Sequence, residues 1–587
     1  MADQLARIES ILALDIGSVN TQAVLIAQVE GTYQFVARAQ LPTTLEEPWA
    51  DVAVGVRHVV EQLSRIAMRP LLSDSGDLIS PEQDNGSGVD VLVVTSSAAE
   101  PLRLVLAGLV GDLSVDSLRR AAAGTYTWVE DVIALLGASS LSEDARARRI
   151  VALQPDAVCI AGGSDGGASG PVLDLVESLA LGAGLIEPSL RPAIVYAGNA
   201  SLRPRVRQLV GQDIPLIMAG GNVRPSLETE DLGPLQSELE ALHVNTKLAA
   251  VPGLAEVAAW STLPILSTAR SFGTALQYLG TTGDPRRGAL GVDVGAATTL
   301  LAAGFGGQLY PTVRSDIGTA FGGARLVAEV GHEAIARWLP FELAPGELAA
   351  FVINKELHPS SIPPDIRELL IEQALAREAI RATLKVARPG WPRLNSNPIG
   401  LLPPMEPIVG SGAVLTRAPR LGQAALILLD ALEPIGVTKL LLDVYNLMPG
   451  LGAIAVASPL AAVQAVENKG LLLLGTAVIP VGRGVRAGEV VLGVKMSYDT
   501  GGDLEVEVAA GTLEILPLPP GQQARLELRP RRGIDIGYGP GRGGKPLSVE
   551  GSAIGLIVDA RGRPLMLPAD PERSRERIQQ WLWDVGA

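Results

Sequence analysis

Two stretches of the chain repeat one pattern of apolar and polar positions. An apolar run leads to an acid and a glycine, a small polar turn follows, and a second apolar run leaves. Residues 11–25 read ILALDIGSVNTQAVL, and residues 290–301 read LGVDVGAATTLL. Each stretch therefore predicts a β-hairpin with Asp-x-Gly at the end of its first strand.

The first part of the chain carries further regular patterns. Residues 11–41 predict three strands, and residues 50–68 predict a helix with one apolar face. Residues 73–88 are polar and rich in glycine, which indicates a loop. Residues 89–95 predict a buried strand.

Three apolar runs in the middle of the chain end alike. They are AVCIAGG at residues 157–163, AIVYAGN at 193–199 and PLIMAGGN at 215–222. Helical patterns separate them, which predicts parallel strands. Parallel sheets place ligands beyond the carboxyl ends of their strands, and loop 163–167, Asn199 and Asn222 fall there. These residues are either tight turns or ligand contacts.

The character of the sequence changes after about residue 475. Short runs with some alternation, separated by glycine and proline turns, predict a β-barrel or sandwich. A terminal helix follows, and we expect its Trp581 and Trp583 to dock on the chain itself. The expected parts are a first lobe at 1–150, an inserted parallel α/β segment at 151–280, a second lobe at 281–475, and a β-rich domain with a helix at 476–587.

The two hairpins resemble the phosphate-binding hairpins of the actin, Hsp70 and sugar-kinase superfamily, in which two related lobes clamp a nucleotide. Gly17 and Gly295 would let the backbone come close to phosphate. Asp15 and Asp293 would hold Mg²⁺, through water. Residues 407–415, PIVGSGAVL, resemble the superfamily's loop against adenine and ribose. One such hairpin alone could be an ordinary polar turn, but the pair with this loop favours a nucleotide site.

A set of strings makes the resemblance more specific. They occur in the order TSSAAEPLRLVLAGLV, PDAVCIAGGSDGG, YAGN, NVRP, VDVGAATT, SDIGTAFG, NKELHPSSIP, IVGSGAVL and LLDVYNLMPGLG. Over about residues 9–475 the chain resembles the accessory L protein of adenosylcobalamin-dependent glutamate mutase, a family unrelated to mismatch repair. The resemblance implies an actin-like, two-lobed ATPase with a duplicated ribonuclease-H-like fold. It also implies ATP and Mg²⁺ as ligands, and a helper role towards a B12-dependent mutase.

The resemblance carries over residue by residue. It implies catalytic and metal-binding roles for Asp15 and Asp293. The implied nucleotide-binding residues are Gly17, Ser18, Thr21, Gly295, Thr298, Thr299, Gly410, Ser411 and Gly412. Two departures lie in the second hairpin, where the family has a further glycine and a trailing acid but this chain has Ala296 and Leu300. Nucleotide binding is therefore a safer expectation than efficient turnover.

Composition excludes several other classes of protein. The 587 residues carry a formal net charge of −15, which argues against a general nucleic-acid binder. The one cysteine, Cys159, allows no disulfide within the chain, and the four histidines show no metal-binding spacing. We see no signal peptide and no apolar run long enough to span a bilayer, which predicts a cytoplasmic protein.

Three functions stay open on the sequence alone. The first is an actin-like ATPase that acts on a protein partner, and the second is an actin-like protein that assembles into filaments. The third is a small-molecule kinase, for which Asp165 and Asp316 are the candidate bases. A mutase activity is not expected, because the Asp-x-His-x-x-Gly cobalt-ligating motif is absent around all four histidines.

Overall fold

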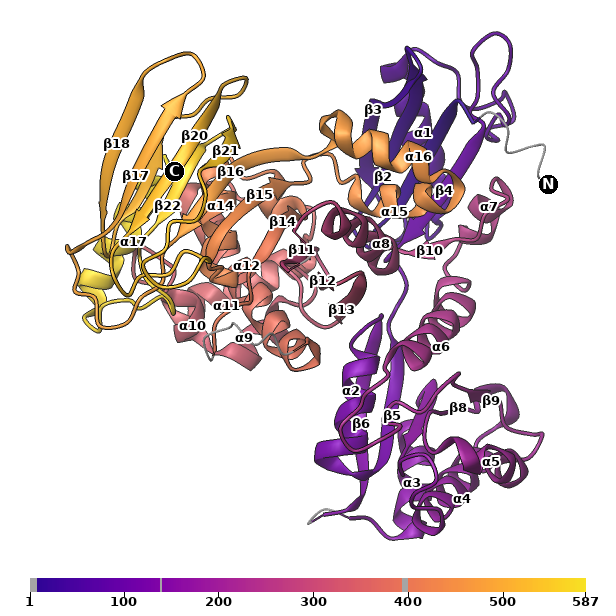
Figure 1. The fold of residues 1–587 in the computed structure, drawn as a ribbon. Coiled ribbons are helices and arrows are strands. Elements are labelled where there is room, and N and C mark those ends of the chain that lie inside the picture. The colour runs from indigo at the N-terminus through magenta and orange to yellow at the C-terminus, as the bar shows by residue number, and fades with distance from the viewer. Residues whose placement is uncertain (1–7, 138–139, 285, 393–399, 587) are drawn as a thin grey trace. The chain divides into compact units, whose positions relative to one another are not determined.

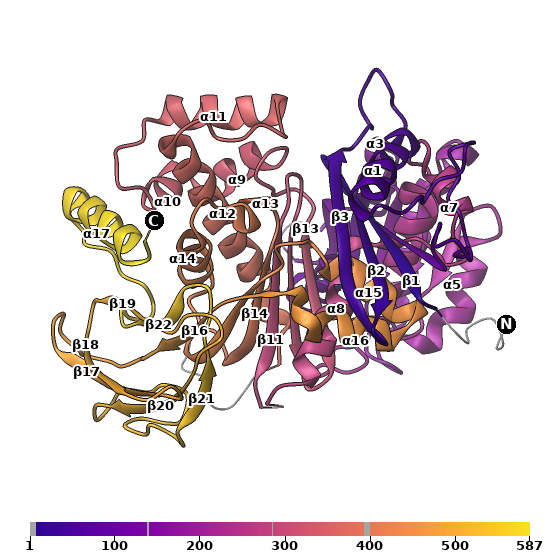
Figure 2. The ribbon, with the colours of Figure 1, turned by 90° about the horizontal axis from the view of Figure 1, so that it is seen from above.

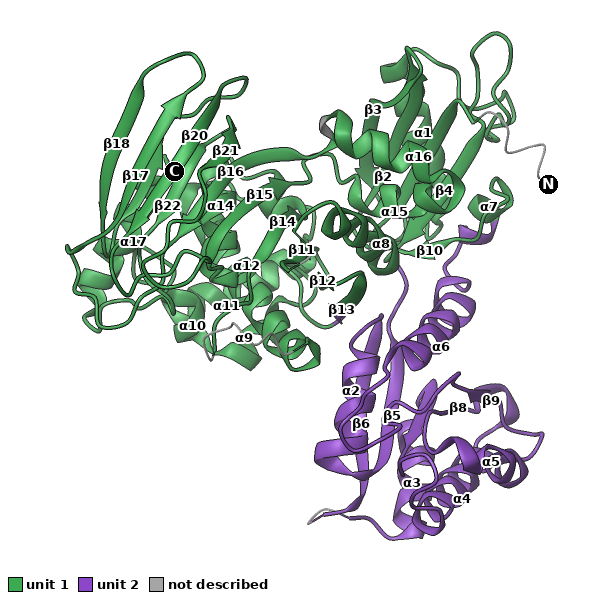
Figure 3. Cartoon of the chain, viewed as in Figure 1, with its two compact units in different colours: residues 1–97, 256–310, 316–587 green, residues 98–255, 311–315 purple. Residues whose placement is uncertain are grey.

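The computed structural model describes residues 8–137, 140–284, 286–392 and 400–586. The chain divides into two compact units (Figure 3). The first unit comprises residues 1–97, 256–310 and 316–587, and the second comprises residues 98–255 and 311–315.

The first predicted hairpin opens a five-stranded sheet in the first unit. The sheet order is β10-β4-β1-β2-β3. The bounds are β1 (Ser10–Ile16), β2 (Asn20–Val29), β3 (Thr32–Pro42), β4 (Val91–Ser96) and β10 (Leu266–Ser267). Strands β1, β2 and β3 pair antiparallel, whereas β4 and β10 extend the sheet in parallel.

The second predicted hairpin opens an eight-stranded sheet whose first part repeats that order. The order is β13-β12-β11-β14-β15-β16-β22-β19. The bounds of the repeated part are β11 (Gly288–Val294), β12 (Thr299–Phe305), β13 (Gln308–Arg314), β14 (Met405–Ser411) and β15 (Gly436–Leu442). As in the first sheet, an antiparallel hairpin is followed by two parallel strands. This repeat confirms the predicted actin-like, duplicated ribonuclease-H-like fold.

Two helices follow equivalent strands of the two sheets. Helix α8 (Thr268–Thr281) begins directly after β10, and α15 (Met448–Ala457) follows β15. The two helices pack on each other (Figures 1 and 2). The other helices of this unit are α1 (Val52–Ala67), α9 (Gly323–Val330), α10 (His332–Ala336), α11 (Pro345–Leu357), α12 (Ile366–Ala387), η5 (Arg388–Gly390), α13 (Ala413–Thr416), α14 (Leu421–Leu432), α16 (Pro459–Ala465), η6 (Val466–Gly470) and α17 (Pro571–Asp584).

The C-terminal part contributes to two different sheets. Strands β16 (Leu472–Ile479), β19 (Leu513–Leu516) and β22 (Gly555–Asp559) extend the eight-stranded sheet. Strands β17 (Val490–Tyr498), β18 (Asp503–Ala509), β20 (Gln523–Pro530) and β21 (Leu547–Glu550) form a separate antiparallel sheet in the order β18-β17-β20-β21. Helix α17 packs on α14, with Trp581 buried and Trp583 exposed. Segment 476–587 is thus partly integral to the second lobe.

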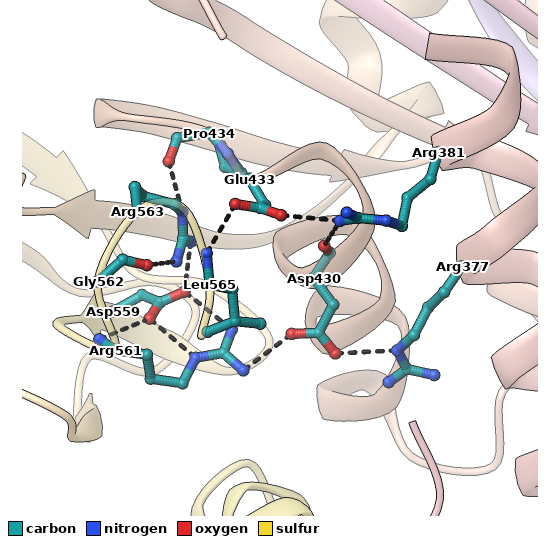
Figure 4. A network of polar contacts seen from close by, with 10 residues as sticks. All are labelled: Arg377, Arg381, Asp430, Glu433, Pro434, Asp559, Arg561, Gly562, Arg563 and Leu565. Carbon is teal, nitrogen blue, oxygen red and sulfur yellow. Dashed lines mark hydrogen bonds and ion pairs between the residues drawn. The ribbon is translucent and has the colours of Figure 1, made fainter. Parts of the chain in front are cut away.

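A buried network of charges joins these last strands to the helices of the second lobe (Figure 4). The Arg561 guanidinium, after β22, donates to Asp559 at 2.9 Å and to Asp430 of α14 at 2.8 Å. Arg377 of α12 donates to the other oxygen of Asp430, and Arg563 donates to Asp559. Arg561 thus bridges Asp559 and Asp430, and all five side chains are at most 4% exposed.

The second unit contains a five-stranded parallel sheet in the order β6-β5-β7-β8-β9. The strands are β5 (Leu102–Val110), β6 (Thr127–Leu136), β7 (Ala157–Ala161), β8 (Ala193–Tyr196) and β9 (Leu216–Met218). The helices are η1 (Gly111–Val115), α2 (Asp116–Ala122), α3 (Glu143–Leu153), α4 (Gly170–Gly184), η2 (Pro188–Leu190), η3 (Ala200–Leu202), α5 (Arg203–Val210), α6 (Gly233–His243) and η4 (Val244–Leu248), and α7 (Leu254–Ala259) follows. The unit begins at Ala98, upstream of the expected 151, because β5 and β6 pair with β7.

Candidate functional site

The two hairpin tips have the same backbone geometry. The N–H of Gly17 donates to the carbonyl of Asn20, and the N–H of Gly295 donates to the carbonyl of Thr298, both at 2.9 Å. A Cβ on Gly17 would lie 3.0 Å from the Asn20 oxygen, and a Cβ on Gly295 would lie 3.1 Å from the Thr298 oxygen. A side chain at either position would crowd the turn, so both turns favour glycine.

The hydroxyl residues of the hairpins occupy two levels. Ser18 and Thr298 lie in the turns and are partly exposed. Thr21 and Thr299 are buried at the start of the returning strands. The Thr21 hydroxyl bonds to that of Thr43, and Thr299 donates to the carbonyl of Ile317 at 2.9 Å. The two glycines, Ser18 and Thr298 thus lie at the hairpin tips. The two buried threonines lie at the start of the following strands and hold the tips through hydrogen bonds.

Asp15 lies at the end of β1 and accepts three hydrogen bonds. The hydroxyls of Thr95 and Thr268 donate to it at 2.7 and 2.8 Å, and the amide of Asn446 donates at 3.1 Å. Burial raises the pKa of Asp15, and the three donors oppose that rise.

Asp293 occupies the equivalent place at the end of β11. Its neighbour in β14 is Ser411, whose hydroxyl opposes a rise in the pKa of Asp293. Burial, followed by the charges of Asp15 and Asp443, raises the pKa of Asp293 from 3.8 to about 7. This carboxyl therefore gives up its proton much less readily than an exposed aspartic acid.

The third carboxylate is Asp443, which lies outside both predicted hairpins and the nucleoside loop. It follows β15 and accepts the N–H groups of Leu447 and Met448 at 2.7 and 2.9 Å, at the start of α15. Burial raises its pKa to about 6 against the effect of these two donors. The sequence does carry a signal for this residue. Asp443 is an acid directly after a buried strand, and Met448-Pro449 begins a helix soon after it.

The repeat of the fold explains how these groups come together. In the first sheet the ends of β1 and β4 and the start of α8 carry Asp15, Thr95 and Thr268. In the second sheet the ends of β11 and β14 and the residue after β15 carry Asp293, Ser411 and Asp443. Each half thus sets an aspartate beside a hydroxyl and a third polar group, and the third group is an acid in the second half only.

Asn446 links the two halves of this site. Its backbone is in the left-handed region, with φ at 51°, which asparagine tolerates better than most residues. Its Nδ2 donates to Asp15, and its Oδ1 accepts from Ser411 at 3.3 Å. Gln22, the cross-strand neighbour of Asp15, donates to the carbonyl oxygens of Tyr445 and Asn446. No local pattern in the sequence pointed to Asn446 as part of the site.

The predicted nucleoside loop ends β14. Gly410 lies inside the strand, where a Cβ would be 3.2 Å from Leu415 and Leu428. Gly412 has φ at 92°, and a Cβ there would lie 2.2 Å from the carbonyl oxygen of Val294. The loop thus packs directly on the second hairpin, and only glycine allows that contact.

The two departures in the second hairpin have different consequences. Ala296 has no positive φ, so it imposes no backbone strain. Leu300 is buried directly opposite Asp293, as Gln22 is opposite Asp15. Opposite residues of an antiparallel pair share a face, so an acid at position 300 would add charge beside a carboxyl that already resists ionisation.

The donor set fits a cation held through water. Three buried or partly buried carboxylates lie within electrostatic reach of one another. Within the described residues no three acid, histidine or cysteine side chains are close enough to bind a metal ion jointly. Since Mg²⁺ keeps several of its waters, an indirect site of this kind suits it.

The two candidate kinase bases have other partners. Asp165 belongs to the second unit and accepts the N–H of Ala200 and the amide of Asn222. Asp316 lies 3.5 Å from Arg325. No observation on either residue favours a kinase.

The raised pKa of Asp293 makes the stability of the ligand-free protein depend on pH. The folded state keeps this proton up to about pH 7, whereas an unfolded chain releases it near 4, so stability falls as pH rises through that window. We expect Asp293→Asn to raise the free energy of unfolding at pH 8 by roughly 2–4 kcal/mol and to have little effect at pH 4. Urea unfolding at both pH values measures this, with exposed Asp74→Asn as the control. A variant less stable than the parent at pH 8 would show that the three carboxylates do not repel one another.

A model of the MutL protein family matches residues 11–469, which is more than half of the chain. The chain belongs to the MutL protein family. The protein MutL of Clostridium tetanomorphum is 24% identical to it over 392 residues, which cover 63% of this chain and 77% of that protein. The match to the family includes both hairpins, the nucleoside loop and α15, and it stops just before β16.

Two solved structures align only weakly with this MutL family member. The nucleotide-free structure of acetone carboxylase aligns with a TM-score of 0.32 and 12% identity, over 85% of this chain and 81% of that one. Xylulose kinase from Bifidobacterium adolescentis aligns with a TM-score of 0.27 and 11% identity, over 80% of this chain and 96% of that one. The fold assignment rests on the repeated strand order. In the described part of the chain, no helix is both long and apolar enough to cross a membrane.

Proposed function

We propose that this MutL family member binds Mg·ATP at the paired hairpins and uses hydrolysis to act on a protein partner. One observation carries the proposal: two hairpins with identical turn bonding end in Asp15 and Asp293, whose charges interact with each other and with Asp443. The ionised forms of these three carboxyls are unfavourable on their own, and a bound cation would stabilise them.

Each residue has a physical role in this proposal. The turns at Gly17 and Gly295 would let the backbone approach the phosphates closely. Ser18 and Thr298 would donate hydroxyl hydrogen bonds from the same hairpin tips. Gly410, Ser411 and Gly412 form the loop proposed for the nucleoside. Asp15, Asp293 and Asp443 would orient water around Mg²⁺, which neutralises charge on the phosphates during transfer.

The same contacts would couple the nucleotide to the helices. Asp15 bonds to the first residue of α8, and Asp443 bonds to the first residue of α15. A change in charge at the site therefore reaches both helices, which pack on each other. We infer that nucleotide hydrolysis shifts these two helices and that the protein is a cytoplasmic helper of reactivase type. The family relationship suggests a B12-dependent mutase as its partner.

Hydrolysis by site variants tests this proposal. We expect Asp15→Asn and Asp293→Asn to lower the rate of phosphate release from Mg·ATP by on the order of 100-fold, because each removes charge that would hold the cation. Asp74→Asn, in the exposed loop between α1 and β4, should keep the parental rate. Either site variant hydrolysing at the parental rate would remove that residue from the proposed mechanism.

A further inference from the structure

The second unit contains a cavity of about 220 Å³ that the nucleotide site does not use. Its walls come from three connections, at residues 109–114 after β5, 161–168 after β7 and 222–227 after β9. All three follow the carboxyl ends of strands in one parallel sheet. An engineered cavity of about 150 Å³ is large enough for benzene, so this one is large enough for a somewhat bigger molecule.

The topology of the sheet places the cavity at a particular point. Numbered within this unit, the strand order is 2-1-3-4-5, so the chain crosses from β6 over β5 to reach β7. Helix α2, after β5, packs on one face of the sheet, and α4, after β7, packs on the other. The connections after β5 and β7 therefore diverge, which is the switch point where open α/β sheets bind ligands.

The loop after β7 is built for close approach at this point. Gly162 and Gly163 have φ of 157° and 70°. A Cβ on Gly162 would lie 2.6 Å from the Leu109 side chain, and a Cβ on Gly163 would lie 2.6 Å from the Ala168 carbonyl oxygen. Gly162 thus brings the loop against the end of β5, and Gly163 lets the loop fold back on Ala168, so both glycines shape the cavity wall.

A polar network holds this loop in place. Asn222 donates to the carbonyl of Gly163 and to the carboxylate of Asp165, both at 3.0 Å. Asn199, which is fully buried, accepts the N–H of Gly166 at 3.2 Å. The glycine-flanked Asp165 that the sequence singled out is thus a brace for the loop rather than a group that faces a ligand.

The bonding of the polar atoms excludes a phosphate cradle. The N–H groups of residues 165, 166 and 167 all bond within the unit. The Arg224 guanidinium donates to Ser117 and to the carbonyl of Leu227, and it pairs with Glu230. Ser164 is different, because its hydroxyl has no hydrogen-bond partner among the described residues although it lines the cavity.

We propose that this cavity binds a small, uncharged, mainly apolar ligand with one polar group that bonds to Ser164. The remaining wall is largely apolar, and its apolar side chains are those of Leu109, Val110, Leu113, Ala161, Ala168, Val223 and Leu227. The charged side chain in the wall, Arg224, is already neutralised by Glu230, so a ligand charge would have no partner there. The site is separate in the sequence from every residue assigned to the nucleotide.

Fluorine NMR of the full chain tests the proposal with two probes. We expect 5-fluoroindole, which carries one N–H, and fluorobenzene, which carries none, both to broaden and shift on adding the parental protein at millimolar probe. Ser164→Ala should weaken 5-fluoroindole binding about fivefold to tenfold through the lost hydrogen bond, and it should leave fluorobenzene binding unchanged. Equal binding of 5-fluoroindole to Ser164→Ala and parent would overturn the role of Ser164.

Two variants at the cavity mouth test its location. Ala168→Trp and Leu227→Trp place a large ring at exposed positions that line the cavity, so both should abolish binding of both probes. Ser189→Trp, exposed just before β8 at the other end of the strands, is the matched control and should bind like the parent. Circular dichroism checks that each variant is folded. If only one of the two mouth variants folds, that variant alone is enough for the test. Undisturbed probe signals with the parent, or parental binding by a folded mouth variant, would refute the site.

Discussion

Replacing Arg561 by methionine is expected to destabilise the second lobe by about 3–5 kcal/mol, because it leaves two buried carboxylates without their shared partner. Arg561 is fully buried and bonds to Asp559 and Asp430. Its guanidinium carbon also lies 4.6 Å from the centre of the Trp581 ring. The pKa of Asp559 lies below its usual range because of Arg561 and Arg563, which shows how strongly this carboxylate depends on them.

The same substitution elsewhere in the C-terminal part provides the control. Arg529 of β20 is exposed and lies 3.5 Å from partly exposed Glu527, so Arg529→Met should change stability by less than about 0.5 kcal/mol. Urea unfolding of both variants measures the difference. Truncation after residue 475 should give an aggregated product, because it removes half of β16 together with all of β22 and α17. Equal stability of the two variants, or a soluble folded truncation, would mean that the C-terminal part is a separable domain.

Replacing Gly452 by alanine is expected to have the second large effect. In an exposed helix this change stabilises by about 1 kcal/mol. At Gly452, however, a Cβ would lie 1.8 Å from the carbonyl oxygen of Ser271 in α8, well inside van der Waals contact. The backbones of α8 and α15 must therefore separate, and we expect a loss of about 2–4 kcal/mol, comparable to overpacking of a well-packed core.

Gly346 in α11 is the matched control for this change. It is exposed, and a Cβ there would meet no atom within 4 Å. Gly346→Ala should therefore leave the midpoint of thermal unfolding unchanged or raise it, whereas Gly452→Ala should lower it by several degrees. Because α8 and α15 begin at the proposed site, Gly452→Ala should also weaken nucleotide binding. Unfolding midpoints that move together in the two variants would show that the helices do not touch as described.

Local patterns in the sequence predicted the two hairpins well. The turn residues, the acid and the two apolar runs lie within 15 residues in each case, so the pairing of β1 with β2 and of β11 with β12 follows from neighbouring positions. Helix α1 and the strands of the C-terminal part were also evident from their periodicity.

Features that depend on distant partners were not predictable in the same way. Asp443 and Asn446 join the site because β15 pairs with β14, and the loop that follows it reaches Asp15, more than 400 residues away in the sequence. Strand β16 lies at the start of the predicted β-rich segment, yet it pairs with β15 in the second lobe. Periodicity identifies a strand but does not name the strand beside it.

Direct titration of the full chain with ATP in the presence of Mg²⁺ is the measurement closest to the central claim. The paired hairpins predict saturable one-to-one binding and a midpoint of unfolding that rises with nucleotide concentration. At a hundred times the dissociation constant, the free energy of unfolding should increase by about 2.7 kcal/mol. Binding should need Mg²⁺ and should weaken in Asp15→Asn and Asp293→Asn but not in Asp74→Asn. No heat and no shift at millimolar Mg·ATP, or equal binding by all three variants, would contradict a nucleotide site at these hairpins.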